Sequence, residues 1–247
     1  MLRFLIAGLL LILYLLISIP FLGVEWIVGL INRRAADISQ LRFVQAGFRI
    51  VLWIAGTRVT YIGNENLPKK GEAVLYTANH RGIFDIVAAY AHMPDLTGFI
   101  SKDSIAKVPV LRLLMKRLHC LFLNRKNNKQ GMQTILKSIE YMEKGISIFI
   151  FPEGTRNKNP DNTALLMFHN GSFKAAQKIG CPVIPVAITN ADACFERQFP
   201  RLKPAHVIVH FGKPVLYEDL PEEGKKHIGD YFQGVVRGML TEDAALV

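Results

Sequence analysis

The chain has 247 residues, of which 50% are hydrophobic and 20% are charged, and this composition excludes a disordered or collagen-like chain. Thirty Lys and Arg residues against twenty Asp and Glu residues give a net charge of +10, which favours an anionic partner: nucleic acid, an anionic membrane face or a phosphorylated substrate. The three cysteines, Cys120, Cys181 and Cys194, are too few and odd in number for a disulfide framework, and they fit free thiols in a reducing compartment.

The N-terminal segment is the first predicted element. Residues 4–24 carry no charged side chain and are long enough to cross a bilayer, which takes roughly 20 apolar residues. A signal peptide would have a shorter apolar region and a small-residue cleavage site, and residues 23–26 form a poor one. Arg33 and Arg34 follow the run against a single Arg3 before it, so we expect the bulk of the chain on the cytoplasmic face of the cell membrane, anchored by this segment.

The next predicted element is an amphipathic helix over about 35–56, where apolar residues recur at helical spacing. Arg42 and Arg49 lie seven residues apart on one face, and Trp53 has an amphipathic ring suited to a lipid headgroup layer. Two interpretations fit: a helix lying in the membrane interface, or an ordinary helix packed on the domain. We assign residues 1–56 to a membrane-anchoring helical segment and 57–247 to one α/β domain.

Short apolar runs alternate with helical patterns through the rest of the chain. Several of the runs are apolar on both faces, as at Ser147–Phe151, which is typical of a sheet covered on both sides. The fold class predicted is therefore α/β, with a central, mostly parallel sheet flanked by helices. Strands are expected at 58–62, 73–78, 97–101, 120–124, 147–151, 182–188 and 206–211, and helices at 84–93, 105–118, 130–144, 164–179 and 223–240.

Several common motifs are missing from the sequence. It contains no G-x-x-x-x-G-K phosphate loop, no G-x-S-x-G nucleophile elbow, no C-x-x-C pair and no H-E-x-x-H metal motif. A nucleotide kinase, an elbow-type serine esterase and a zinc enzyme therefore lack support, and we expect no metal site.

One candidate catalytic pair follows the predicted strand 73–78. The strand runs directly into Asn79 and His80, Gly82 lets the chain turn, and Asp85 begins the next helix. Ligand sites in α/β folds lie at the carboxyl ends of strands. There the carboxylate of Asp85 could hold one ring nitrogen of His80 and leave the other free to take a proton from a hydroxyl. The alternative is a histidine that merely packs at the end of a strand.

A second candidate site is the sequence Phe-Pro-Glu-Gly-Thr-Arg at 151–156, which also follows an apolar strand. Gly154 permits a tight turn with exposed N–H groups, and Arg156 offers a planar fork for a phosphate or a carboxylate. Glu153 could orient that arginine or bind a sugar-like hydroxyl. Taken alone, the segment also fits an ordinary turn with an ion pair.

Residues 102–129 carry eight Lys and Arg residues against Asp103, a net charge of +7. Apolar residues interleave with these charges, as in a basic amphipathic helix that lies on an anionic lipid surface. A solvated helix face and a nucleic-acid site are the alternatives, and the neighbouring apolar segment favours the membrane.

The order and spacing of these pieces resemble the 1-acyl-sn-glycerol-3-phosphate acyltransferase (lysophosphatidate acyltransferase) family. The resemblance covers about 73–190, and the combination of H-x4-D with F-P-E-G-T-R is far more specific than either motif alone. The matching blocks are Asn79, His80 and Asp85; Phe122 and Arg125; residues 151–156; and Val183-Ile184-Pro185-Val186.

The resemblance implies an acyltransferase that moves a fatty acyl group from acyl carrier protein or coenzyme A to the sn-2 hydroxyl of 1-acylglycerol 3-phosphate, giving phosphatidate. It implies no cofactor beyond this acyl thioester co-substrate, no nucleic-acid partner, and a membrane-embedded N-terminal helical pair. It assigns His80 as the base and Asp85 as the group that orients it. The implied acceptor-binding residues are Glu153, Gly154, Thr155, Arg156, Arg125 and, less firmly, Lys102.

Departures from the family pattern leave the acceptor open. The family often has Ser at the position of Gly82 and Asp at that of Asn124, and it usually has a basic residue before Gly171. The remaining hypotheses are acylation of another lysophospholipid, acylation of glycerol 3-phosphate, and a non-catalytic module that binds membrane surfaces.

Overall fold

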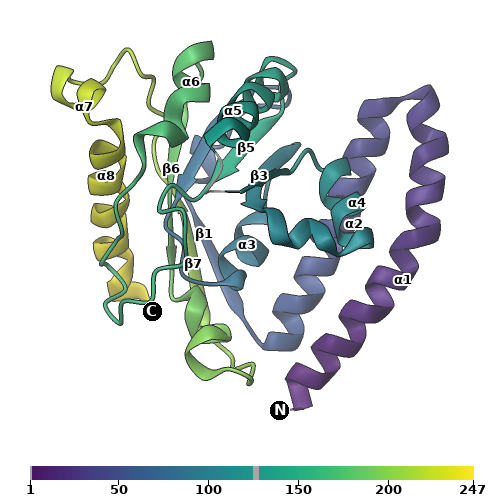
Figure 1. The fold of residues 1–247 in the computed structure, drawn as a ribbon. Helices are drawn as coiled ribbons and strands as arrows, with labels where there is room; N and C mark the ends of the chain where they lie inside the picture. Colours follow the sequence, from purple (N-terminus) through teal and green to yellow (C-terminus); the bar gives the residue numbers. More distant parts are fainter. Residues whose placement is uncertain (1, 125–127) are drawn as a thin grey trace.

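The computed structural model describes residues 2–124 and 128–247, and its strands form one seven-stranded sheet (Figure 1). The strand order is β1-β7-β6-β2-β5-β3-β4; β6 and β7 run antiparallel, and the other neighbouring pairs are parallel. The α/β fold class predicted from the sequence is confirmed. The strands are β1 (Arg58–Ile62), β2 (Leu75–Ala78), β3 (Thr97–Lys102), β4 (Leu121–Leu123), β5 (Ser147–Ile150), β6 (Val183–Thr189) and β7 (His206–Phe211).

Helices cover both faces of this sheet (Figure 1). The α-helices are α1 (Leu2–Ile31), α2 (Arg33–Ala55), α3 (Ile83–Tyr90), α4 (Pro109–Arg117), α5 (Asn128–Glu143), α6 (Lys174–Ile179), α7 (Glu222–Lys226) and α8 (Ile228–Asp243). Short 3-10 helices are η1 (Asn64–Asn66), η2 (Asp103–Lys107), η3 (Asn170–Phe173), η4 (Ala191–Cys194), η5 (Glu196–Gln198) and η6 (Ala244–Leu246).

The two faces of the sheet bury two hydrophobic clusters, because successive side chains of a strand point to opposite faces. Tyr76 of β2 and Phe149 of β5 are fully buried in the cluster shared with α2 and α3. Leu75 and Ile148, one residue earlier in the same strands, are buried in the cluster shared with α6 and α8. This two-sided burial explains the continuous apolar runs of the central strands.

Helices α1 and α2 form a hairpin that stands beside the sheet (Figure 1). Asn32 separates them and caps α2, since its side chain accepts a hydrogen bond from the N–H of Ala35 at 3.0 Å. The ring of Phe43 stacks on the rings of Tyr14 and Phe21, with centroids 4.8 and 4.1 Å apart. The aromatic packing between the two helices is therefore centred on the ring of Phe43.

The polar face of α2 is packed on the domain. Gln45 donates hydrogen bonds to the carbonyls of Tyr90 (3.1 Å) and Met93 (2.8 Å). The guanidinium groups of Arg42 and Arg49 donate to other carbonyls in the same segment, those of Pro94 and Ala91. These carbonyls lie at and just after the end of α3, where helix geometry leaves carbonyl groups that are not paired within the helix. Of the two interpretations of this helix, the structure supports the one in which it packs on the domain.

Buried charges join the hairpin to the domain. Arg117 at the end of α4 pairs with Glu25 of α1 at 3.3 Å and with Asp37 of α2 at 3.7 Å. The second oxygen of Asp37 lies 3.0 Å from Nε2 of His119. Both carboxylates are buried, so this cluster fixes α1 and α2 against α4 and β4.

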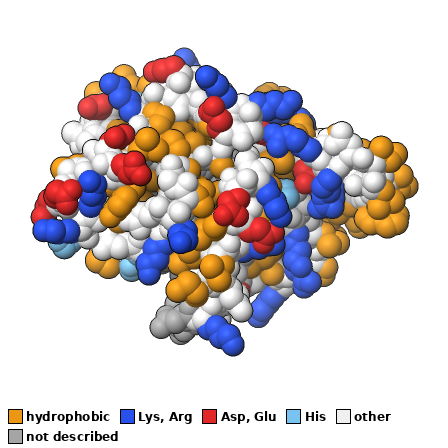
Figure 2. All heavy atoms as spheres, turned by 90° about the horizontal axis from the view of Figure 1, so that it is seen from above, with side chains coloured by type: hydrophobic (Ala, Val, Ile, Leu, Met, Phe, Trp, Pro, Cys, Tyr) orange, Lys and Arg blue, Asp and Glu red, His pale blue; other side chains and the backbone are white. Residues whose placement is uncertain are grey.

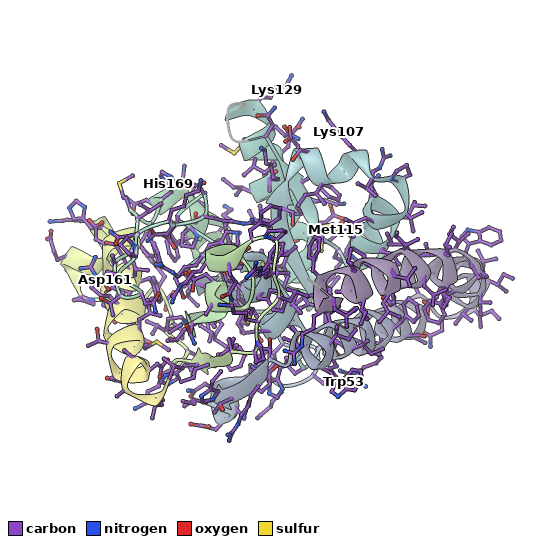
Figure 3. All side chains as sticks on the ribbon, turned by 90° about the horizontal axis from the view of Figure 1, so that it is seen from below. Trp53, Lys107, Met115, Lys129, Asp161 and His169 are labelled. Carbon is purple, nitrogen blue, oxygen red and sulfur yellow. The ribbon has the colours of Figure 1, made fainter. Side chains whose placement is uncertain are left out.

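Helix α1 presents an unusually apolar surface. It is the one helix among the described residues that is long and apolar enough to cross a membrane, and it runs unbroken through Pro20. Large apolar side chains along it are exposed; Leu9 is 67% and Ile31 90% exposed. Figure 2 shows these hydrophobic side chains at the projecting end of the hairpin, with Lys and Arg side chains beside them. Trp53 of α2, 81% exposed, projects from the body of the molecule (Figure 3).

Three predicted helices differ from the observed ones. The helix expected at 164–179 begins only at Lys174, because the segment before it is held in an irregular path: the N–H of Leu166 donates to Glu153, and that of His169 to the carbonyl of Pro152. The helix expected at 105–118 is divided at Val108, since Pro109 starts α4 and restricts the residue before it. The C-terminal helix is divided at His227.

Candidate active site

The site forms where four neighbouring parallel strands, β2, β5, β3 and β4, end at the same edge of the sheet. Asn79 fixes the end of β2. Its fully buried amide accepts a hydrogen bond from the N–H of Ile188 (2.8 Å) and donates one to the carbonyl of the same residue (2.9 Å). This side chain continues the ladder between β2 and β6, and it sets the direction in which the chain leaves the strand.

His80 and Asp85 form the pair that their spacing predicted. Nδ1 of His80 lies 2.8 Å from Oδ2 of Asp85, which is fully buried at the start of α3. The same oxygen accepts the backbone N–H groups of Arg81 (2.6 Å) and Gly82 (2.7 Å). Three donors therefore converge on one carboxylate oxygen, and this arrangement favours the tautomer of His80 with its proton on Nδ1. Nε2 is left as the basic nitrogen.

A second contact, on the face of its ring, also orients His80. The ring stacks on Phe151, the first residue after β5, with ring centroids 4.1 Å apart and planes 19° from parallel. The side chain of His80 is 11% exposed, so one edge of the ring reaches the surface. The carboxylate fixes the ring's rotation and Phe151 fixes its plane, so the imidazole is oriented before any substrate binds.

Glu153 supports the backbone of the same turn. Its Oε1 accepts the N–H of His80 at 2.8 Å, and its Oε2 accepts the N–H of Leu166 at 2.9 Å. Burial raises the pKa of this carboxyl group, and the two N–H donors oppose that rise. Both oxygens are engaged inside the protein, so the arginine partner considered for Glu153 in the sequence is absent from its contacts within the described residues.

The turn after Glu153 reaches the surface. Gly154 has a φ of 69°, a left-handed conformation that favours glycine, and the next two residues, Thr155 and Arg156, are exposed. Arg156 pairs with Glu196, whose Oε1 lies 3.6 Å from Nη1 of the arginine. The side chain of Arg156 is 48% exposed, so it remains accessible to an anion.

Arg81, a buried residue, joins the loop that follows Arg156 to the turn between His80 and Asp85. Arg81 pairs with Asp192 at 3.1 Å and donates hydrogen bonds to the carbonyls of Asn159 and Asp161. Asp192 also receives two hydrogen bonds from Arg197, at 3.0 and 2.8 Å. The loop after Arg156 is therefore fixed by Arg81, and Arg81 shares the carboxylate of Asp192 with Arg197.

An apolar groove of about 650 Å³ lies next to the turn. Its floor includes Leu75, Ile148 and Ile150 from the sheet. Its walls come from α5 and α6, for example Ile135 and Ala175, and its rim includes Thr155. The cavity thus combines an apolar interior with a polar mouth beside the Glu-Gly-Thr turn, which suits a ligand with a hydrocarbon part and a polar head.

Of the two other predicted acceptor-binding residues, Lys102 and Arg125, the structure describes only Lys102. Lys102 is exposed at the end of β3, which is two strands away from β2. Arg125 follows β4 and lies outside the described residues. The structure therefore places His80, Asp85, Glu153 and Arg156 around one turn, and it places Lys102 at the periphery.

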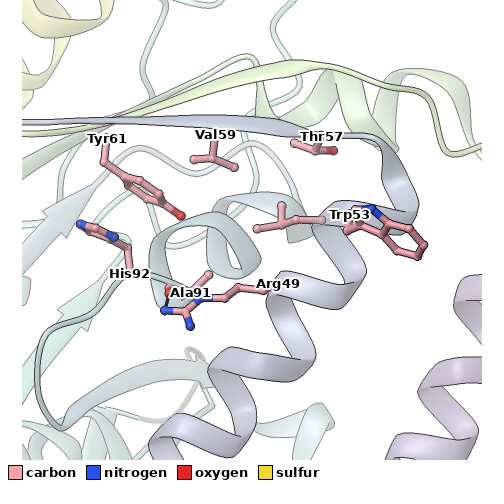
Figure 4. Close-up of a pocket in the computed structure, with 8 residues that line it drawn as sticks. Arg49, Trp53, Thr57, Val59, Tyr61, Ala91 and His92 are labelled. Atoms are coloured by element: carbon pink, nitrogen blue, oxygen red, sulfur yellow. Dashed lines mark hydrogen bonds between the residues drawn. The ribbon is translucent and has the colours of Figure 1, made fainter.

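A second cavity, of about 320 Å³, lies at the other end of α3 (Figure 4). Arg49, Trp53, Tyr61 and His92 line it, together with Ala91 and other neighbours. The rings of Tyr61 and His92 stack 3.9 Å apart, and the Tyr61 hydroxyl donates to the carbonyl of Ala88. These side chains are occupied with packing, and the cavity is separate from the His80 site.

Sequence reasoning missed three groups at the site. Phe151 begins the predicted 151–156 site, but the sequence did not indicate that its ring supports His80. Arg81 and Glu196 were not singled out. The N–H of Ile83 donates to Glu196 at 2.7 Å across 113 residues of sequence, and such a contact leaves no local pattern that could have predicted it.

Comparisons with known proteins found similar sequences and a similar fold. A family described as Acyltransferase matches residues 58–189. A 1-acyl-sn-glycerol-3-phosphate acyltransferase of Borreliella burgdorferi is 31% identical over 153 residues, which cover 62% of this chain and 59% of that protein. The protein of the same name from Salmonella typhimurium is 33% identical over 155 residues, 62% of this chain and 60% of its own length. The chain thus matches about three fifths of the length of these relatives.

A solved structure shares the fold. The crystal structure of the 1-acyl-sn-glycerophosphate (LPA) acyltransferase PlsC from Thermotoga maritima aligns with 98% of this chain and 95% of its own, with a TM-score of 0.78 and 22% sequence identity. The likeness includes the α1–α2 hairpin as well as the sheet, because it covers nearly the whole chain.

Proposed function

The chain belongs to the acyltransferase family, and on this premise we propose that it transfers a fatty acyl group from an acyl thioester to the sn-2 hydroxyl of 1-acylglycerol 3-phosphate, giving phosphatidate. The observation that carries the proposal is the His80–Asp85 pair, in which Nδ1 is held at 2.8 Å by a buried carboxylate and Nε2 is left basic. The names of the similar proteins support the choice of acceptor.

The proposed reaction needs one base and one activated acyl group. Nε2 of His80 takes the proton of the acceptor hydroxyl as its oxygen attacks the thioester carbonyl. The tetrahedral intermediate then collapses, the C–S bond breaks, and the imidazolium returns the proton to the leaving thiolate. Asp85 stabilises the imidazolium in between. The thioester, on acyl carrier protein or coenzyme A, is a co-substrate, and the step requires no metal or other cofactor.

Arg156 is the proposed ligand for the acceptor's phosphate. Its guanidinium is exposed next to the catalytic turn, and a planar fork of N–H donors binds phosphate oxygens well. Thr155 and the backbone of Gly154 lie on the same turn, and the apolar groove beside them suits an acyl chain. Arg125 and Lys102 are proposed as further cations near the acceptor.

We place the protein at the cytoplasmic face of the membrane. The exposed apolar surface of α1 supports insertion, and the basic residues after it favour the cytoplasmic side. A lysophospholipid acceptor resides in the bilayer, so an enzyme anchored in the membrane can bind it without first transferring it into water.

The test is acyl transfer by purified protein in detergent or lipid, from labelled acyl carrier protein and from labelled coenzyme A, to 1-acylglycerol 3-phosphate. His80→Ala should lower the rate by at least about 100-fold, since a general base contributes about 10²–10⁴-fold. The variant should still associate with membranes. His227 is exposed and lies between α7 and α8, so His227→Ala is the matched control and should keep full activity.

Other outcomes would select other functions. Transfer to another lysophospholipid or to glycerol 3-phosphate alone would correct the acceptor. Equal rates for the wild type and His80→Ala would rule out the base. Inactivity toward all acceptors, with lipid binding that weakens steeply at high salt, would favour a non-catalytic module that binds anionic membranes.

A further inference from the structure

Glu196 is an acidic residue inside a site that is proposed to bind an anion. It begins η5, and its Oε1 accepts the N–H of Ile83, the first residue of α3, at 2.7 Å. The same oxygen lies 3.6 Å from Nη1 of Arg156. The side chain is 20% exposed, and its Oε2 is buried without a hydrogen bond from the described part of the chain.

Glu196 fits there because residue 82 is glycine. A Cβ atom at position 82 would lie 2.6 Å from Cδ of Glu196 and would overlap its carboxylate oxygens. The φ of Gly82 is −157°, which any residue adopts, so the backbone itself does not require glycine. The space that a serine would fill in the family pattern is therefore taken by a carboxylate from a distant loop.

The surroundings of Glu196 disfavour the charged form of its carboxylate. Burial raises the pKa of Glu196, the negative charge of Asp85 raises it further, and Arg156 and the N–H of Ile83 oppose the rise. A second anion brought to Arg156 would meet Glu196 at close range. Phosphate and Glu196 would then compete for one guanidinium.

We propose that Glu196 is a resident counter-ion of Arg156 that the acceptor's phosphate displaces, and that it thereby sets how tightly phosphate-bearing acceptors bind. The inference rests on the proposed function, because it takes Arg156 as the phosphate ligand. Glu196 holds the guanidinium near the site while the site is empty. It then opposes phosphate binding, so its removal strengthens binding.

The experiment measures binding apart from catalysis. Purified full-length protein in detergent is titrated with glycerol 3-phosphate, which carries the phosphomonoester and dissolves freely, and the dissociation constant is read by phosphorus NMR. Glu196→Gln keeps an oxygen for the N–H of Ile83 and removes the charge. It should lower the dissociation constant by about threefold, as expected for a partly exposed charge pair. An unchanged or raised constant would overturn the proposal.

A double-mutant cycle tests whether the effect passes through Arg156. In an Arg156→Gln background, Glu196→Gln should leave the dissociation constant unchanged. The same threefold gain in that background would contradict the proposal, because it would reflect a general loss of negative charge. Glu222→Gln, at a site that is 83% exposed, is the matched control and should have no effect.

The packing can be tested separately. Gly82→Ala should lower the thermal stability of the wild type, because the new methyl group overlaps Glu196, and it should cost much less in a Glu196→Ala background. An equal cost in both would contradict the placement of Glu196. If the wild type failed to acylate any acceptor while Glu196→Gln still tightened phosphate binding, the proposed function would be wrong and this inference would stand.

Discussion

At the residue scale, the chemistry depends on which nitrogen of His80 carries the proton. Asp85 accepts three hydrogen bonds on one buried oxygen, from Nδ1 of His80 and from two backbone N–H groups. The carboxylate therefore does two things at once: it closes the turn between β2 and α3, and it selects the tautomer with a basic Nε2. The structural role of this side chain and its proposed catalytic role therefore coincide.

Asp85→Asn should separate the two roles. With its amide oxygen in the place of Oδ2, the asparagine can still accept the backbone N–H groups and Nδ1–H of His80, so the turn should survive, but a neutral amide no longer stabilises the imidazolium that forms when His80 takes a proton. We expect acyl transfer to fall by about 100-fold or more with a small change in melting temperature. Asp219→Asn, at an exposed site, is the control. Near-normal activity would show that the negative charge of Asp85 is not needed for the reaction.

Glu153 should matter for stability as well as rate. Each of its oxygens accepts a buried backbone N–H, and Glu153→Gln would turn an NH₂ group toward one of these donors. A buried polar group left unpaired costs about 1–3 kcal/mol, and each kcal/mol lowers the melting temperature of a chain this size by about 2–4 °C. Thermal unfolding checks this against Glu143→Gln, an exposed change on α5. Unchanged melting would mean that these hydrogen bonds are dispensable.

At the element scale, a charged pair ties the last helix to the sheet. Nδ1 of His210 on β7 lies 3.1 Å from Asp243 at the end of α8. The hydrogen bond to Asp243 raises the pKa of His210 above its ordinary value of 6.5, although burial opposes the rise. The pair thus stabilises the folded protein when the histidine is protonated.

The pH dependence follows from this direction. The contribution is fully present below pH 6.5, the pKa of the unfolded histidine, and it is lost as the pH rises through the higher folded pKa. Asp243→Asn should therefore lower the denaturation midpoint more at pH 6 than at pH 8. Glu242→Gln, its exposed neighbour, should shift the midpoint little at either pH. An equal deficit for Asp243→Asn at both values would contradict the prediction.

The elements also show what local patterns can predict. The strand at 206–211 and the helix near 130–144 were predicted closely, because burial on a sheet or against one face leaves a periodic signal in the chain. The segment 164–169 was predicted as helix from similar apolar spacing, yet hydrogen bonds to Glu153 and Pro152 hold it in an irregular path, and the helical turns begin only at η3. There the tertiary hydrogen bonds outweigh the local preference.

The site likewise has some contacts that sequence spacing predicts and others that it does not. His80 and Asp85 were predictable because five residues across one turn bring them together. Glu196 reaches the site from a loop more than 110 residues away, and Arg81 acts through Asp192 at a similar separation. No spacing rule connects such residues, so only the fold shows which side chains surround and support His80 and Asp85. The domain boundary at 56–57 and the roles of the acceptor-binding residues stay predictions.

At the scale of the whole molecule, two kinds of surface meet at one side. The hairpin exposes the apolar residues of α1, and exposed lysines lie nearby on η2, α4 and the start of α5; Lys107 and Lys129 point outward together in Figure 3. Apolar burial is insensitive to salt, whereas attraction between exposed charges is screened within about 10 Å at 0.1 M salt. The two surfaces should therefore make separable contributions to membrane binding.

We expect the apolar helix to hold the protein and the basic residues to aid its arrival. Membranes washed with about 1 M salt should retain the wild type, because an inserted span of about 20 residues has no electrostatic attraction to lose, and detergent should release it. Replacing Lys107, Arg112 and Lys116 with Gln should slow binding to vesicles that contain anionic lipid and leave binding to neutral vesicles unchanged. Replacing Lys137, Lys144 and Lys158 with Gln is the matched control, since these residues lie outside η2 and α4. Release by salt alone would mean that the exposed charges, and not α1, carry the attachment.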